Sequence, residues 1–160
     1  TQFIAMVYML NFILMKVGGW TNLNEGIIAL TGGRYQGLNL QFLLGYTMAP
    51  LTWALGVPAP DIATVGHLVG EKIILNEMVA YFSFGELIAE GAFYEGKSVI
   101  MATYMLCGFA NISSIGIILG GIGALAPGKR KMLSQLGFKA LIGGAMASLL
   151  SATLVGIILG

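Results

Sequence analysis

The sequence predicts an all-α integral membrane protein made of transmembrane helices, a re-entrant hairpin and a broken helix. Of its 160 residues, 57% are hydrophobic and only 9% are charged, whereas an ordinary soluble domain has about 25% charged residues. Residues 98–128 and 140–160 contain no charge, and each run approaches or exceeds the roughly 20 residues that a spanning helix needs. Polar residues interrupt several apolar runs, which lipid tolerates only where the backbone is buried in protein or lines a wet cavity.

The first two segments are predicted to be a spanning helix and an interfacial helix. Residues 1–20 form the first transmembrane helix if Lys16 snorkels near one end. Residues 21–57 begin with the polar connection "TNLNEGIIALTGGRY" and continue with the uncharged but interrupted "LNLQFLLGYTMAPLTWALGVP". Trp53 suits a membrane–water interface, so we expect this part to lie along or dip into the interface. A kinked spanning helix is the alternative.

Residues 58–95 are predicted to form a re-entrant hairpin. Their apolar runs are too short to span, and they are separated by Gly70-Glu71-Lys72 and by Asn76-Glu77. Two half-length helices that meet within the membrane satisfy this pattern. The alternative is an amphipathic segment outside the membrane, which the acids near the far end of the segment favour.

The last two segments are a broken helix over 96–127 and a basic loop with a final transmembrane helix over 128–160. The broken helix contains "CGFANISSIG", where Asn and Ser stand at the centre of an apolar run. The sequence "GKRKMLSQLGFK" supplies the basic residues of the loop, and no acid follows Glu95. By the positive-inside bias this loop lies in the cytoplasm.

The polar cluster of the broken helix is the first candidate ligand site. In a continuous helix Cys107, Asn111 and Ser114 share one face, and Ser113 points elsewhere, where it could bond a carbonyl one turn back. Packing against neighbouring helices explains single residues of this kind. The whole cluster is better explained by a helix break whose freed backbone groups face a polar ligand, as at the midplane of transporters.

Glu77 is the second candidate, because a carboxylate costs about 2.5–3.5 kcal/mol at the bilayer centre and is a functional hypothesis by default. A structural ion pair with Lys72 is the alternative. Glu71 is nearer to Lys72 in sequence and could pair with it instead, which leaves Glu77 free. His67 is compatible with a proton relay, a ligand or a satisfied polar residue.

Several function classes are excluded or disfavoured. A single cysteine and a single histidine make a metal site of these residue types improbable, so no metal is expected in this chain. No Gly-x-Ser-x-Gly pattern surrounds Ser113 or Ser114, and we predict neither catalytic residues nor an enzyme. The net charge of +1 gives no reason to expect nucleic acid. Because the first residue is Thr and no signal segment precedes the first apolar run, we expect the chain to be part of a longer protein.

The strings "GEKIILNEMVAY" (70–81) and "CGFANISSIGIILGGIG" (107–123) resemble the C-terminal half of the concentrative nucleoside transporters, and the likeness covers essentially the whole chain. The resemblance implies a transport domain that moves against a trimeric scaffold, with residues 1–20 as a scaffold helix. It implies that Glu77, Asn111 and Ser114 hydrogen-bond the ribose hydroxyls and that Phe109 lines the pocket. Two positions depart from the family pattern: Met78 replaces the usual Phe, and Glu71 replaces an uncharged residue.

The resemblance therefore implies cation-coupled nucleoside uptake, with sodium or a proton as coupling ion, in a multi-pass protein of the plasma or bacterial inner membrane. No cofactor is expected. The partners are a nucleoside, the bilayer, the N-terminal remainder of the transporter and the other subunits of a homotrimer. The family's base-reading motif and its ion site lie in the other half, outside these 160 residues. The alternative function is a structural or channel-like subunit whose polar residues only mediate helix packing.

Overall fold

The computed structural model describes residues 2–31, 33 and 35–160, so Thr1 of the first predicted segment and Gly32 and Arg34 of the second lie outside the described residues. Every regular element among the described residues is helical, which confirms the predicted all-α class. The elements are α1 (Gln2–Trp20), α2 (Leu23–Thr31), α3 (Leu40–Ala54), η1 (Ala59–Asp61), α4 (Ile62–Ile74), α5 (Glu77–Ala89), α6 (Gly96–Leu106), α7 (Ile112–Leu125), η2 (Pro127–Lys129) and α8 (Arg130–Leu159).

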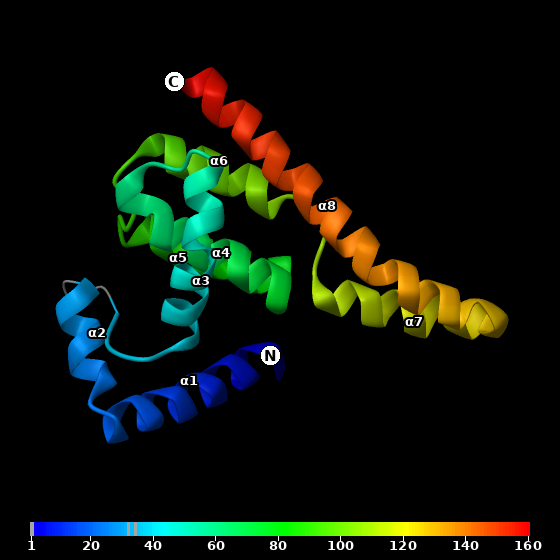
Figure 1. Cartoon of the computed structure of the whole chain (residues 1–160), viewed down its shortest axis with the longest axis horizontal. Helices are drawn as coiled ribbons and strands as arrows, with labels where there is room; N and C mark the ends of the chain where they lie inside the picture. Colours follow the sequence, from blue (N-terminus) through cyan, green and yellow to red (C-terminus); the bar gives the residue numbers. More distant parts are fainter. Residues whose placement is uncertain (1, 32, 34) are drawn as a thin grey trace.

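The helices form a packed body and a protruding arm (Figure 1). Helices α3 to α6 make the body, with α1 and α2 along one side of it. Helix α8 packs on α6 through its C-terminal half and on α7 through its N-terminal half, and the α7–α8 pair extends away from the body. The hydrophobic core lies in the body, around Val65, Leu68, Met101 and Met105.

Among the described residues, one segment is both long and apolar enough to cross a membrane by itself, and it comprises the 33 residues 127–159. Its helix α8 has 30 residues and is about 45 Å long by the usual helical rise, against about 30 Å for the hydrocarbon core of a bilayer. Helix α7 is a shorter apolar helix of 14 residues.

Helix α3 begins at Asn39, whose side chain accepts a hydrogen bond from the Phe42 amide at 2.7 Å and so caps the helix. With 15 residues it is too short to span a bilayer alone. It packs closely on α4, because a Cβ atom at Gly66 would lie 2.7 Å from the Gly45 carbonyl oxygen. The interfacial location of α3 stays a prediction.

Helices α4 and α5 form the predicted hairpin. Each has 13 residues, about 20 Å by the usual rise, so neither crosses a bilayer alone. The turn between them is short, and Asn76 caps α5 by accepting a hydrogen bond from the Val79 amide at 2.9 Å. At the base of the hairpin the fully buried Asp61 carboxylate accepts hydrogen bonds from the amides of Tyr94 at 3.0 Å and Glu95 at 3.1 Å. Asp61 thus ties the start of α4 to the start of α6.

The predicted helix break is also present. Helix α6 ends at Leu106 and α7 begins at Ile112, and residues 107–111 between them are not α-helical. The break leaves the last carbonyls of α6 and the first amides of α7 without partners inside their own helices.

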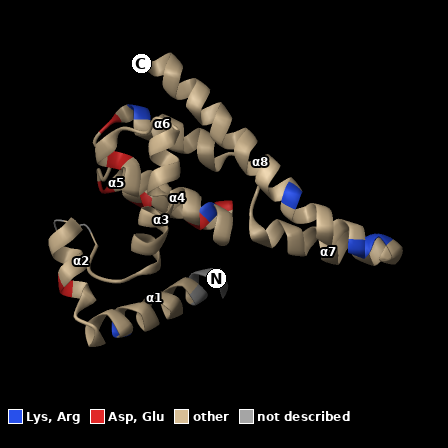
Figure 2. Ribbon diagram, viewed as in Figure 1, with Lys and Arg blue, Asp and Glu red and all other residues tan. Residues whose placement is uncertain are grey.

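The basic segment is not a loop as expected. Lys129 ends the 3-10 turn η2, and Arg130, Lys131 and Lys139 lie in α8. Lys, Arg, Met, Leu and Gln are all strong helix formers, so the segment continues the final helix. Figure 2 shows these basic residues on the arm, mostly at its tip, with no acidic residue on α7 or α8.

We expect Asp61→Asn to lower the free energy of unfolding by about 1.5–3 kcal/mol, because an amide replaces a carboxylate that accepts two backbone hydrogen bonds. Unfolding by SDS titration in mixed micelles measures the change. Glu90→Gln, at an exposed residue at the end of α5, is the matched control. Equal stability of the two variants would contradict the assigned role of Asp61.

Candidate ligand site at the hairpin tip and the helix break

The Lys72 ammonium group lies at the C-terminal end of α6. It donates hydrogen bonds to the Met105 carbonyl oxygen at 2.6 Å and to the Ser148 hydroxyl oxygen at 2.9 Å. Lys72 is 2% exposed, so this cation is almost fully withdrawn from solvent. A cation is favourable at a helix C-terminus, where the last carbonyls carry a partial negative charge. One side chain thereby joins α4, the end of α6 and the middle of α8.

The Glu77 carboxylate meets the other side of the break. The Asn111 amide nitrogen Nδ2 donates a hydrogen bond to Oε2 of Glu77. The Asn111 oxygen Oδ1 accepts from the Ser114 amide at 2.8 Å and lies 2.9 Å from the Ser114 hydroxyl. Asn111 is therefore the N-cap of α7 and at the same time the partner of the acid at the hairpin tip.

Ser113 completes the connection between the two helix interruptions. Its hydroxyl lies 2.9 Å from the Leu75 carbonyl oxygen and 2.8 Å from Oδ1 of Asn111. The Leu75 carbonyl lies in the turn between α4 and α5. Ser113 therefore connects the first turn of α7 to the tip of the hairpin. The expectation that Ser113 bonds a carbonyl one turn back is wrong, because the turn before it is not helical.

The electrostatic character of the junction follows from two helix starts. Helix α5 begins at Glu77 and α7 begins at Ile112, and both N-termini adjoin the Glu77–Asn111 pair. The unsatisfied amides of a helix N-terminus carry a partial positive charge that stabilises an anion nearby. A carboxylate in the first turn of α5 is thus favoured by its own helix and by the amide of Asn111.

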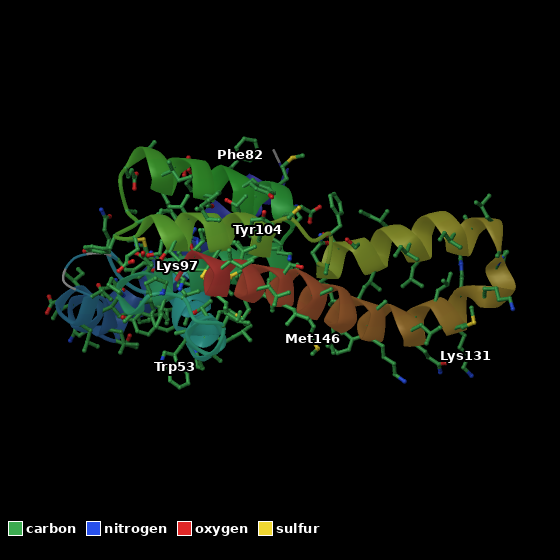
Figure 3. The ribbon with its side chains drawn as sticks, turned by 90° about the horizontal axis from the view of Figure 1, so that it is seen from above. Trp53, Phe82, Lys97, Tyr104, Lys131 and Met146 are labelled. Carbon is green, nitrogen blue, oxygen red and sulfur yellow. The ribbon has the colours of Figure 1, made fainter. Side chains whose placement is uncertain are left out.

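Three of the four predicted site residues come together here, and the fourth lies beside them. Asn111, Ser114 and Glu77 are joined as described, and Phe109 lies in the break with 80% of its surface exposed. Phe109, Asn111 and Ser114 line a cavity of about 200 Å³ between α7 and α8. Phe109 also borders an open groove of about 400 Å³ with Glu77, Met78, Tyr81 and Phe82. Figure 3 shows Phe82 projecting outward from α5.

The structure contradicts the alternative ion pairs of Lys72 and the shared helical face of Cys107 and Asn111. The ion pair found among the described residues joins His67 and Glu71, with Nε2 and Oε1 3.0 Å apart, so neither Glu71 nor Glu77 pairs with Lys72 within that part of the chain. Cys107 shares no helical face with Asn111, because it is the C-cap of α6 and the break separates the two.

Sequence reasoning did not identify Lys72 and Ser148 as partners. Ser148 lies in the final apolar segment, and nothing in its spacing points to a lysine 76 positions earlier. The available signal was Lys72 itself, since a lysine within an apolar segment requires acceptors. Carbonyls freed by a predicted helix break are natural candidates for them.

Comparison with known proteins gives consistent relatives. Residues 1–156 match the model of a family described as "Na+ dependent nucleoside transporter C-terminus". The chain is 38% identical over 154 residues to the uncharacterized transporter YutK of Bacillus subtilis, covering 96% of this chain and 34% of YutK. It is 40% identical over 135 residues to sodium/nucleoside cotransporter 1 of Rattus norvegicus, covering 77% of this chain and 21% of that protein.

The fold has a solved counterpart. The structure of CNTnw in an inward-facing substrate-bound state superposes with a TM-score of 0.83 at 35% identity, covering 97% of this chain and 35% of that one. The chain thus spans about a third of the length of the curated relative YutK and of this structure. The superposition supports the all-α membrane fold with its hairpin and broken helix.

We expect Gly108→Ala to destabilise the junction by about 1–3 kcal/mol, the usual cost of overpacking. A Cβ atom at Gly108 would lie 2.6 Å from Cβ of Ser148 and 3.3 Å from Nζ of Lys72. Gly116→Ala is the matched control, because a Cβ atom at this glycine of α7 meets nothing within 4 Å and alanine favours a helix. Thermal stability of the purified full-length protein measures both. A Gly108→Ala variant as stable as Gly116→Ala would contradict the close approach.

Proposed function

The chain belongs to the family of Na+-dependent nucleoside transporters, whose C-terminal part it matches, and we propose that it is the C-terminal portion of a cation-coupled nucleoside transporter. The whole protein imports nucleosides through a cell membrane, the plasma membrane or a bacterial inner membrane, as a multi-pass protein. The relatives named as cotransporters and permeases support this function. The chain itself contributes contacts to the sugar.

The observation that carries the proposal is the Glu77–Asn111 pair at the junction of the hairpin tip and the helix break. A ribose presents neighbouring hydroxyl groups, and each hydroxyl both donates and accepts hydrogen bonds. The Asn111 bond is made to Oε2 of Glu77, and Oε1 accepts no hydrogen bond among the described residues. The Asn111 amide nitrogen also has a second hydrogen to donate. A carboxylate beside an amide therefore matches a vicinal diol, and the carboxylate gives charge-assisted bonds.

Ser114 and Phe109 complete the proposed site. The Ser114 hydroxyl lies 2.9 Å from Oδ1 of Asn111, which places it to orient the amide and to contact a sugar hydroxyl. The exposed ring of Phe109 borders both the cavity and the groove. An aromatic face of this size is suited to packing against the flat part of a nucleoside.

The coupling ion is sodium or a proton, bound mainly by the N-terminal half of the transporter. We propose a homotrimer, with α1 belonging to the scaffold and the hairpin, the broken helix and α8 to the moving domain.

The direct test is accumulation of labelled uridine or adenosine by cells that express the full-length protein. The proposal is supported if the internal nucleoside concentration rises above the external one and this accumulation is lost when the ion gradient is removed. Uptake that only equilibrates indicates the channel-like alternative.

We expect Glu77→Gln to weaken binding of a riboside about ten- to a hundredfold, because it removes a charge-assisted hydrogen bond that contributes about 1.5–3 kcal/mol. The loss should shrink for a nucleoside that lacks the ribose hydroxyls, since the partner is then already absent. A double cycle of binding constants for wild type and variant with both nucleosides isolates the contact.

Glu90→Gln is the control for the loss of a carboxylate from α5 and should bind both nucleosides like wild type. If Glu77→Gln weakens both nucleosides equally, Glu77 acts on the structure of the junction and not on the sugar hydroxyls. That result would remove the ribose assignment and leave the hydrogen bond to Asn111 as the role of Glu77.

We also expect the two ends of α8 to lie on opposite sides of the membrane, with Lys131 in the cytoplasm by the positive-inside bias. Figure 3 places Lys131 at the far end of the arm, and the 30 residues of α8 exceed the length of a span. Cysteines introduced singly at Lys131 and at Gly160, in a cysteine-free full-length background, should label from opposite sides with an impermeant reagent. Labelling of both from one side would contradict this topology.

A further inference from the structure

Helix α4 carries a second buried polar pair that the proposed nucleoside site does not use. Nε2 of His67 and Oε1 of Glu71 are 3.0 Å apart, and the two side chains are 9% and 1% exposed. The other carboxylate oxygen of Glu71, Oε2, has no hydrogen-bond partner among the described residues, and Nε2 of His67 lacks the alignment of a hydrogen bond. A buried polar atom without a partner costs about 1–3 kcal/mol and is rare enough to need an explanation.

Glu71 lines a cavity of about 170 Å³ among α1, α3, α4 and α5. The cavity is much more polar than the space between α7 and α8, since it also contains amide, hydroxyl and carboxyl side chains. Its lining residues are Val7, Tyr8, Asn11, Gln41, Glu71, Val79, Phe82, Ser83 and Glu86. The orphaned carboxylate thus belongs to a hollow with room for water and with hydrogen-bonding groups on several sides.

Few ionisable side chains other than Glu71 line this cavity. Glu86 of α5 and Tyr8 of α1 are the other ionisable residues that line the cavity, and α3 contributes only the neutral Gln41. The ionisable groups of α6, which also packs on α4, do not line it. Lys72 is the next residue on α4, but its ammonium group is bound to Met105 and Ser148. Within the described chain, His67 is therefore the only basic side chain paired with Glu71.

From this geometry we propose that His67 and Glu71 form a proton-binding site, reached from the cavity and separate from the nucleoside site. A hydronium ion in the cavity loses a proton, so that one of its O–H bonds breaks as an O–H bond forms on Glu71 or an N–H bond forms on His67, and a neutral water remains. Release to a water molecule is the reverse of this step. Histidine is the side chain that ordinarily changes charge between about pH 5 and pH 8.

The cavity lining suits both protonation states. A protonated Glu71 needs an acceptor for its new hydrogen, and a deprotonated one needs donors. Asn, Gln, Ser and Tyr side chains can all donate and accept, and one of each lines the cavity. The cavity also has space for a bridging water. A site built only for a permanent ion pair would instead have fixed partners on both carboxylate oxygens.

The test counts the protons that the purified full-length protein takes up between about pH 8 and pH 5, with a pH-indicator dye in weakly buffered detergent solution and no nucleoside present. We expect Glu71→Gln and His67→Gln each to take up about one proton fewer per chain than wild type. Glu90→Gln, which also removes one carboxyl group but lies outside the cavity, corrects for the ordinary titration of an exposed glutamate. Because no nucleoside is present, the result is independent of the ribose assignment.

Infrared spectroscopy identifies the group that binds the proton. A protonated-carboxyl band that appears on acidification, is absent in Glu71→Gln and persists in Glu86→Gln supports the site. A band that is lost in Glu86→Gln but retained in Glu71→Gln would show that the proton binds to Glu86, and it would overturn the assignment to Glu71. Proton uptake equal to wild type in both His67→Gln and Glu71→Gln would also overturn it. If Glu71→Gln does not elute as a folded protein, His67→Gln alone decides: reduced uptake supports the site and unchanged uptake refutes it.

Discussion

The arrangement of α4, α6 and α8 depends on the hydrogen bonds of the buried Lys72 ammonium group. It brings a full positive charge into a region from which water is excluded, at a cost of several kcal/mol unless partners are supplied. The partners are the Met105 carbonyl, which the helix break frees, and the hydroxyl of Ser148. The lysine thus needs the break, and the broken end of α6 needs a donor. The lysine and the free carbonyl each offset the cost of burying the other in a low-dielectric environment. As a result, the hairpin, α6 and α8 are fixed relative to one another.

The same reciprocity holds on the other side of the break. The start of α7 and the tip of the hairpin are both interruptions that leave backbone groups unsatisfied. Asn111 caps α7 and binds Glu77, and Ser113 reaches the Leu75 carbonyl across the hairpin. Two interrupted helices that would each be unstable alone in lipid therefore satisfy one another. The polar groups left over at their junction, above all Oε1 of Glu77, are the ones available to a ligand.

Much of this organisation could be predicted from the sequence, because length and polarity constrain helices strongly in a membrane. The half-length hairpin and the interruption near Asn111 follow from apolar runs too short or too polar to span. The partners of Lys72 could not be predicted, since hydrogen bonds between residues 76 positions apart leave no periodic signal. The pairing of Glu71 with Lys72, which the sequence left open as an alternative, is not formed, because adjacent residues of a helix point in different directions. The basic segment was expected to be a loop on account of its charge, but its residue types favour a helix.

Helix α4 connects the two polar regions mechanically. Its successive residues Glu71 and Lys72 are directed to the cavity beside α1 and to the helix break, respectively. The helix has little freedom to adjust, because at Gly45 and Gly66 the backbones of α3 and α4 approach so closely that a Cβ atom would lie within 2.8 Å of a carbonyl oxygen. Packed cores of this kind transmit displacements instead of absorbing them. We therefore expect that a displacement of α4 caused by a change of charge at Glu71 would also displace α3 and the contact of Lys72 with Met105 and Ser148. The proposed proton site and the proposed sugar site are separate in their chemistry, but both include residues that α4 positions.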